Sequence, residues 1–215
     1  MSEPIELEAL DLAALLCSRV CHDIISPVGA IINGLEVLDE DNGEDMHDFA
    51  FDLIRRSANQ ASAKLQFARL AFGAAGSTGA EIDLGDAEKV AGGYMEGEKP
   101  EFSWQAPRVL MAKNRVKLLL NLLLLAVAAV PRGGRVSVVV EGDAEHPRFV
   151  LRAAGPNARI PPAFEKLVPG DIAGIAIDAQ AVQAYYAGAL ARACDMSVTA
   201  VLDGDDVVVT AMGEG

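Results

Sequence analysis

The chain has 215 residues, which is room for one large domain or two small ones. Its 31 acidic and 18 basic residues give a net charge of -13, which argues against a nucleic-acid partner, and its 51% of hydrophobic residues excludes a disordered chain. The three cysteines, Cys17, Cys21 and Cys194, are not spaced as a disulfide or zinc framework, so a reducing cytoplasm fits.

Two further features argue against export and membrane insertion. The acidic N-terminus, with Glu3, Glu6 and Glu8, is the opposite of the basic start of a signal peptide. The most apolar run, residues 118–130, is interrupted by Asn121 and is shorter than the roughly 20 residues that span a bilayer. We therefore expect a cytoplasmic protein with no membrane partner, in which residues 118–130 form a buried helix.

The first part of the chain predicts a helical hairpin. Apolar residues recur every three or four positions over residues 7–40 and again up to Phe72, while Asn42-Gly43 supplies turn chemistry between the two segments. Two helices cannot enclose a core. We therefore expect residues 1–78 to form a four-helix bundle by homodimerisation about a two-fold axis.

After Gly79 the pattern changes to a mixture of strands and helices. Because runs of strands alternate with helices, residues 79–215 predict a second domain, an α/β sandwich of helices against one sheet, so that the whole chain has an α+β fold. The expected elements are a strand at 101–105, a helix at 113–130, an antiparallel pair at 135–141 and 148–153, a helix at 178–193, and a hairpin at 197–202 and 206–211.

His22 is the strongest candidate for chemistry. On a helix with about 100° per residue it points away from the apolar stripe, and its neighbours Ser18, Ser26 and Gly29 leave the ring open to a large partner. An exposed neutral imidazole is available as a nucleophile. Pro27 lacks an N–H group and should bend the helix beside it, at the carbonyl of Asp23.

The other candidate side chains have simpler interpretations. His47, in the acidic turn before the second helix, and His146, in a hairpin loop, are expected to be solvated. Cys17 and Cys21 fall on the apolar stripe of the first helix, and no cluster completes a coordination shell with them, so we expect buried small side chains and no metal site.

The residues around His22 resemble a known motif. The run from His22 to Ile31, with His22, Asp23, Ile24 and Pro27 at matching positions, resembles the H-box in the dimerisation and phosphotransfer domain of sensor histidine kinases. This resemblance implies that His22 is the phosphorylated residue and that Asp23 is its accompanying acid.

Residues 79–215 resemble the ATP-binding domain of the same kinases, but they lack its nucleotide ligands. The segment 117–126 is similar to the N-box helix, with Asn121 in place. Leu125 stands where the family has a second Asn that coordinates Mg²⁺, and Ala153 stands where an Asp reads adenine. The glycine-rich lid is missing from residues 170–176. The resemblance therefore implies that the fold is kept, while nucleotide binding and autokinase activity are lost.

A phosphorylatable histidine without an ATP site resembles the ChpT-type histidine phosphotransferases of bacterial phosphorelays, and this likeness covers nearly the whole chain. The family is a homodimer that takes phosphate from the receiver-domain aspartate of a hybrid histidine kinase and passes it to response-regulator aspartates, in the cell-cycle relay of alphaproteobacteria. The resemblance implies no cofactor on this chain and Mg²⁺ on the partner receiver. Candidate residues for receiver docking or phosphate neutralisation are Leu15, Ser18, Arg19, Ile25, Ser26, Gly29, Arg55 and Arg56.

Two other functions are compatible with the residues. The chain could be a non-catalytic module that docks or inhibits a kinase, or an active kinase with an unusual ATP site. Under the phosphotransferase hypothesis, the degenerate domain is expected to form the second half of the receiver-docking surface.

Overall fold

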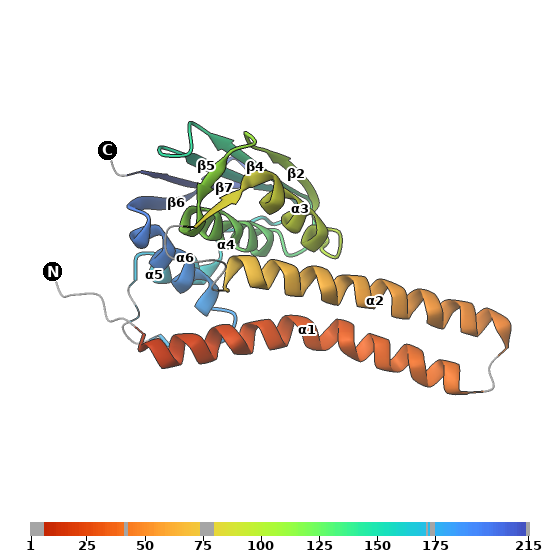
Figure 1. Cartoon of the computed structure of the whole chain (residues 1–215). Coiled ribbons are helices and arrows are strands. Elements are labelled where there is room, and N and C mark those ends of the chain that lie inside the picture. Colours follow the sequence, from red (N-terminus) through yellow and green to blue (C-terminus); the bar gives the residue numbers. More distant parts are fainter. Residues whose placement is uncertain (1–6, 41–42, 74–79, 171, 173–174, 214–215) are drawn as a thin grey trace.

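The computed structural model describes residues 7–40, 43–73, 80–170, 172 and 175–213. The chain begins with two long antiparallel helices, α1 (Ala9–Asp39) and α2 (Glu44–Ala71), which confirms the predicted hairpin (Figure 1). The helices approach closely at Gly34, where a Cβ atom would lie 2.7 Å from Cγ1 of Ile54. Helix α1 continues through Pro27, which is buried. The predicted boundary between residues 78 and 79 lies outside the described residues.

The remainder, which we call the C-terminal domain, combines two sheets with four helices among the described residues. The five-stranded sheet has the order β2-β4-β5-β7-β6; β2 is parallel to β4 and the other neighbours are antiparallel. Strands β1 and β3 form a separate antiparallel pair. The elements are β1 (Glu81–Asp83), α3 (Leu84–Met95), β2 (Glu101–Gln105), β3 (Leu110–Ala112), α4 (Lys113–Ala129), β4 (Arg135–Glu141), β5 (Arg148–Ala154), α5 (Pro162–Leu167), α6 (Val182–Ala193), β6 (Met196–Asp203) and β7 (Asp206–Gly213).

The predicted α+β fold is therefore confirmed, with differences in detail. The expectation of one sheet is wrong, and the short elements β1, α3, β3 and α5 were not predicted. Helix α6 begins at Val182 rather than at Asp178. The Asp178 carboxylate accepts hydrogen bonds from the backbone N–H groups of Ala181 and Gln180. These bonds lower the pKa of Asp178 and hold a turn that precedes the helix.

The core of the C-terminal domain lies between the five-stranded sheet and helices α4 and α6. Alternate residues of β4, β5 and β7 are buried, as expected for strands with one covered face. Twelve of the 17 residues of α4 are buried, which confirms the predicted burial of its apolar run. Figure 1 shows the sheet, then α4 and α6, then the hairpin as successive layers.

The C-terminal domain contacts one end of the hairpin only. Phe67 of α2 and Tyr94 of α3 lie with ring centroids 4.4 Å apart. Near the start of α1, the backbone N–H of Leu7 donates to the Tyr185 hydroxyl of α6 at 3.0 Å. The distal halves of both long helices extend beyond the domain (Figure 1).

The hairpin leaves an apolar surface open, which we call the open stripe. Its large members on α1 and α2 are Leu10, Ile25, Val28, Ile32, Leu35, Phe51 and Leu65, all exposed in the single chain. Cys17 and Cys21 are also exposed, so the prediction of burial is wrong for the isolated chain. The apolar surface of α1 is wider than the strip that α2 covers. Among the described helices, α1 has the length and apolar composition that could span a membrane.

Candidate functional site at His22

His22 lies on the solvent-facing side of α1, as the helical periodicity predicted. Its side chain is 67% exposed. Ser18 and Ser26 are exposed as well, and an added Cβ at Gly29 would meet nothing within 4 Å. The imidazole is therefore open to approach by another protein. Ile25 is 72% exposed beside it, while Leu15 is half-buried.

The carboxylate of Asp23 is shared between two side chains of α1. Its Oδ1 lies 3.5 Å from Nδ1 of His22, at the outer limit of a hydrogen bond, and its Oδ2 accepts from Nε of Arg19 at 3.0 Å. Asp23 and Arg19 are only 22% and 18% exposed. Arg19 and Asp23 are four residues apart, a spacing that joins oppositely charged side chains on one helix face, so the sequence contained the signal for this pair.

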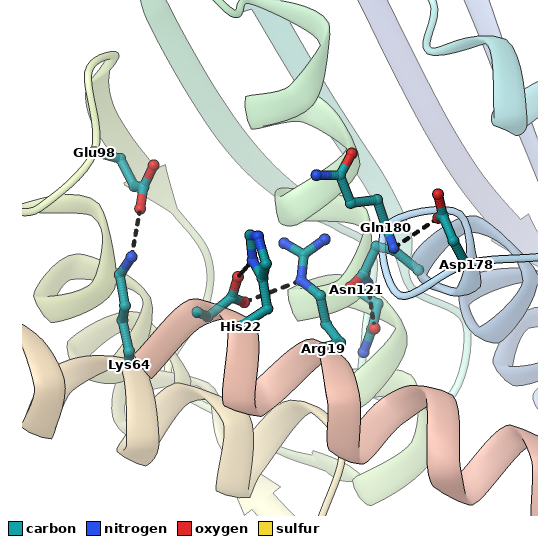
Figure 2. A network of polar contacts seen from close by, with 9 residues as sticks. Arg19, His22, Lys64, Glu98, Asn121, Asp178 and Gln180 are labelled. Atoms are coloured by element: carbon teal, nitrogen blue, oxygen red, sulfur yellow. Dashed lines mark hydrogen bonds and ion pairs between the residues drawn. The ribbon is translucent and has the colours of Figure 1, made fainter. Parts of the chain in front are cut away.

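On the side of Asp23 away from solvent, a cleft of about 590 Å³ separates the hairpin from the C-terminal domain. Arg19, Lys64, Tyr94 and Glu98 line it, and Nζ of Lys64 lies 3.7 Å from Oε1 of Glu98. Burial raises the pKa of the Tyr94 phenol, and the negative charges of Glu98 and Asp23 add to the rise, so the hydroxyl stays protonated at neutral pH. Figure 2 shows Arg19 and His22 on α1 with Lys64 and Glu98 to one side and Gln180 to the other.

Sequence reasoning missed this cleft for a specific reason. Tyr94 lies on α3 and Glu98 follows it, and α3 was not predicted. Which side chains of α2 would meet that segment depends on how the C-terminal domain packs, and no periodicity in the sequence encodes this.

The three positions that correspond to nucleotide ligands in the kinases, Asn121, Leu125 and Ala153, offer no free side-chain polar atom to a nucleotide. Asn121 is fully buried; its Nδ2 donates to the carbonyls of Ala71 and Lys117 at 3.1 and 2.7 Å, and its Oδ1 accepts from Gln183 at 2.6 Å. Leu125 and Ala153 are buried and apolar. Asn121 therefore joins α4 to the end of α2 and to α6, and these positions do not fit a Mg²⁺–ATP complex.

The remaining predicted residues are not brought to His22. Arg55 and Arg56 are exposed and pair with Asp52 at 3.1 and 3.6 Å. They lie roughly 13 Å along α2 from Lys64, which is level with Asp23. Because Arg19 is engaged with Asp23, its role in neutralising a phosphoryl group stays a prediction.

The other two histidines differ in environment. His146 is exposed in the β4–β5 loop as predicted, with Nδ1 3.5 Å from Oδ1 of Asp143. His47 lies inside α2 and is half-buried, so the prediction of a solvated turn residue is wrong; its buried Nε2 has no hydrogen-bond partner among the described residues. Helix α2 begins at Glu44, three residues before His47, so His47 lies on the helix and not in the turn that precedes it. Among the described residues, no group of three His, Cys, Asp or Glu side chains could hold a metal ion.

This chain is similar in sequence to known phosphotransferases. Residues 84–206 match the family of the histidine phosphotransferase C-terminal domain. Protein phosphotransferase ChpT of Brucella abortus (strain 2308) is 53% identical over 211 residues, which cover 98% of this chain and all of that protein. A solved bacterial phosphotransferase superposes with a TM-score of 0.88 at 51% identity, over 98% of this chain and 100% of that one. For the Acinetobacter baumannii histidine kinase AdeS the TM-score is 0.46 at 11% identity, over 90% and 97% of the two chains. This chain belongs to the ChpT-type histidine phosphotransferase family.

Proposed function

We propose that this protein carries phosphoryl groups on His22 in a bacterial phosphorelay of the cell-cycle type. It receives them from the receiver-domain aspartate of a hybrid histidine kinase and delivers them to the aspartates of response regulators. The observation that carries the proposal is the exposed imidazole of His22, which projects from a rigid helix between small side chains and has a carboxylate at its Nδ1 atom.

The chemistry requires little from this chain beyond placement. Nε2 of His22 attacks the phosphorus of the aspartyl phosphate in line; a P–N bond forms as the P–O bond breaks, and the donor carboxylate leaves. In the second half-reaction an acceptor carboxylate attacks the same phosphorus, and the imidazole leaves. Mg²⁺ on the receiver neutralises the phosphoryl oxygens, so this chain holds and orients the ring.

The engaged side chains of the nucleotide-site positions support a shuttle without autokinase activity. Asn121 uses its amide hydrogens and its oxygen within the chain, and Leu125 and Ala153 supply no ligand. A phosphorylatable histidine in a chain without an ATP site must obtain its phosphate from another protein.

The open stripe supports a homodimer, and we propose that this dimer acts in the cytoplasm. Large apolar side chains such as Ile25, Ile32 and Phe51 are 51–72% exposed in the single chain, and a second copy would cover them in a four-helix bundle. The stripe also accounts for the apolar length of α1 without a membrane. Receiver docking would then use the solvent face around His22, with the C-terminal domain beside it.

The test follows a label from two sources. The protein is incubated with a ³²P-phosphorylated receiver domain, and separately with γ-labelled ATP. We expect acid-labile label from the receiver only, and none in His22→Ala. The matched control is His146→Ala, since His146 is also exposed and has a carboxylate at the same 3.5 Å; it should keep the label. Label from ATP would overturn the shuttle, and no label from either source would favour a non-catalytic docking module.

A further inference from the structure

The contacts of Asp23 give Arg19 a role in the chemistry of His22. This inference rests on the proposed function. The two carboxylate oxygens of Asp23 are divided: Oδ2 accepts from Nε of Arg19 at 3.0 Å, which leaves Oδ1 facing Nδ1 of His22 at 3.5 Å. We propose that Arg19 is a positioning residue that orients the Asp23 carboxylate toward Nδ1 of His22 and so prepares Nε2 as the nucleophile.

The chemical reason lies in the two tautomers of a neutral imidazole. Only the tautomer with the proton on Nδ1 has a lone pair on Nε2, and a carboxylate that accepts from Nδ1–H favours it. When the P–N bond forms at Nε2, the ring becomes cationic, and the same carboxylate stabilises the new charge. The benefit depends on where the carboxylate points, because an Asp side chain has several rotamers.

Arg19 is the cation that holds this carboxylate, although a second cation lines the same cleft. Lys64 has nearly the same exposure as Arg19, 16% against 18%, but its Nζ faces Glu98 of the C-terminal domain. Both side chains are partly buried, so solvent competes less for their ion pairs than on an open surface. The two cations are therefore similar in charge and burial and differ in partner, which makes Lys64 a matched control.

The first experiment measures single-turnover transfer from saturating phosphorylated receiver to His22. Arg19→Ala should slow transfer about 10- to 100-fold, as expected when a reacting group loses its orientation, while Lys64→Ala should transfer at the wild-type rate. Asp23→Ala should slow transfer as much as Arg19→Ala or more, and the double variant should be no slower than Asp23→Ala alone. Arg19→Lys, which keeps the charge, should recover part of the rate.

The second experiment reads the tautomer directly, without any transfer. In ¹⁵N-histidine-labelled protein, the share of the Nδ1–H form of His22 should fall in Arg19→Ala and stay unchanged in Lys64→Ala. Circular dichroism and mass in solution confirm that each variant is folded and assembled like the wild type.

The outcomes separate this inference from the proposed function. If wild-type protein takes no label from the receiver, the proposed function fails, and the tautomer measurement still tests the role of Arg19. If wild-type protein is labelled and Arg19→Ala matches it in rate and tautomer, Arg19 has no positioning role. Slowing by the same factor with and without Asp23 would mean that Arg19 acts on the phosphoryl group itself, which also overturns the inference.

Discussion

The hairpin and the C-terminal domain are both rich in apolar residues, yet they bury them very differently. In α4, 12 of 17 residues are buried, whereas in α1 only two of 31 are buried, Pro27 and Gly34. The C-terminal domain closes its core within one chain, because a sheet and two helices cover each other's apolar faces. Two helices lack enough faces to do so. The comparison teaches that the C-terminal domain is complete by itself, whereas the hairpin leaves apolar surface that we propose a second copy covers.

The largest expected effect comes from charging the open stripe. Ile32→Glu with Leu35→Glu places two carboxylates where we expect the second chain, which would bury unpaired charge. Light scattering should show the mass fall from twice the chain mass of 22.6 kDa to a single one, and the helical circular dichroism of the hairpin should decrease.

The control for this variant charges exposed apolar residues of the other region. Val201 and Leu202 on the edge strand β6 are 53% and 60% exposed, close to the 51% and 49% of Ile32 and Leu35. Val201→Glu with Leu202→Glu should leave the dimer intact. A dimer that survives the charges on α1 would mean that the open stripe is not the interface.

The next largest effect is expected from a cavity in the core of the C-terminal domain. Leu120 is fully buried, and Leu120→Ala should lower the free energy of unfolding of the C-terminal domain by about 2–5 kcal/mol. Trp104 of β2 is the only tryptophan, so its fluorescence in urea reports on this region. Leu35→Ala on α1 should instead weaken the dimer, measured by sedimentation, with little effect on the Trp104 transition. A larger shift of the Trp104 transition in Leu35→Ala than in Leu120→Ala would contradict this difference between the two regions.

A smaller loss is expected at the junction between the regions. Asn121→Ala removes the donor to the Ala71 carbonyl at the end of α2 and leaves the Gln183 amide without its acceptor, which should cost about 1–3 kcal/mol. Thermal unfolding followed by Trp104 fluorescence measures this loss. Asn114→Ala, at an exposed position of the same helix, should be nearly neutral. If Asn121→Ala and Asn114→Ala were equally stable, the hydrogen bonds of the buried Asn121 amide would contribute nothing to stability.

The smallest effect concerns reactivity rather than stability. Burial raises the pKa of the Cys194 thiol to about 11. At pH 8 only about one thiol in a thousand is then ionised, so alkylation by iodoacetamide should be slow and should rise about tenfold per pH unit below pH 11. Because Cys17 and Cys21 lie on the open stripe, dilution that dissociates the dimer should speed their alkylation and not that of Cys194. Peptide mass spectrometry reads each site, and rapid labelling of Cys194 in the folded protein would contradict the expected burial.

Particular residues show where sequence-based prediction succeeded. The exposure of His22 and the course of α1 follow from the three- and four-residue recurrence of apolar side chains, which is a local property. The strands β4 and β5 were predicted nearly to the residue, because alternation over seven residues is equally local. The burial of Cys17 was predicted wrongly for the single chain, because the apolar stripe of α1 is wider than the strip that α2 covers.

By itself, then, the sequence determined the helical hairpin, the α+β class of the remainder, and the histidine that faces solvent, because periodicity and short motifs encode each of them. Only the tertiary structure decided that Asn121 joins α4 to α2 and α6, and that Lys64 of α2 faces Glu98 of the C-terminal domain. These contacts depend on how the C-terminal domain packs against the hairpin, and that packing sums many weak apolar contacts between segments far apart in the chain.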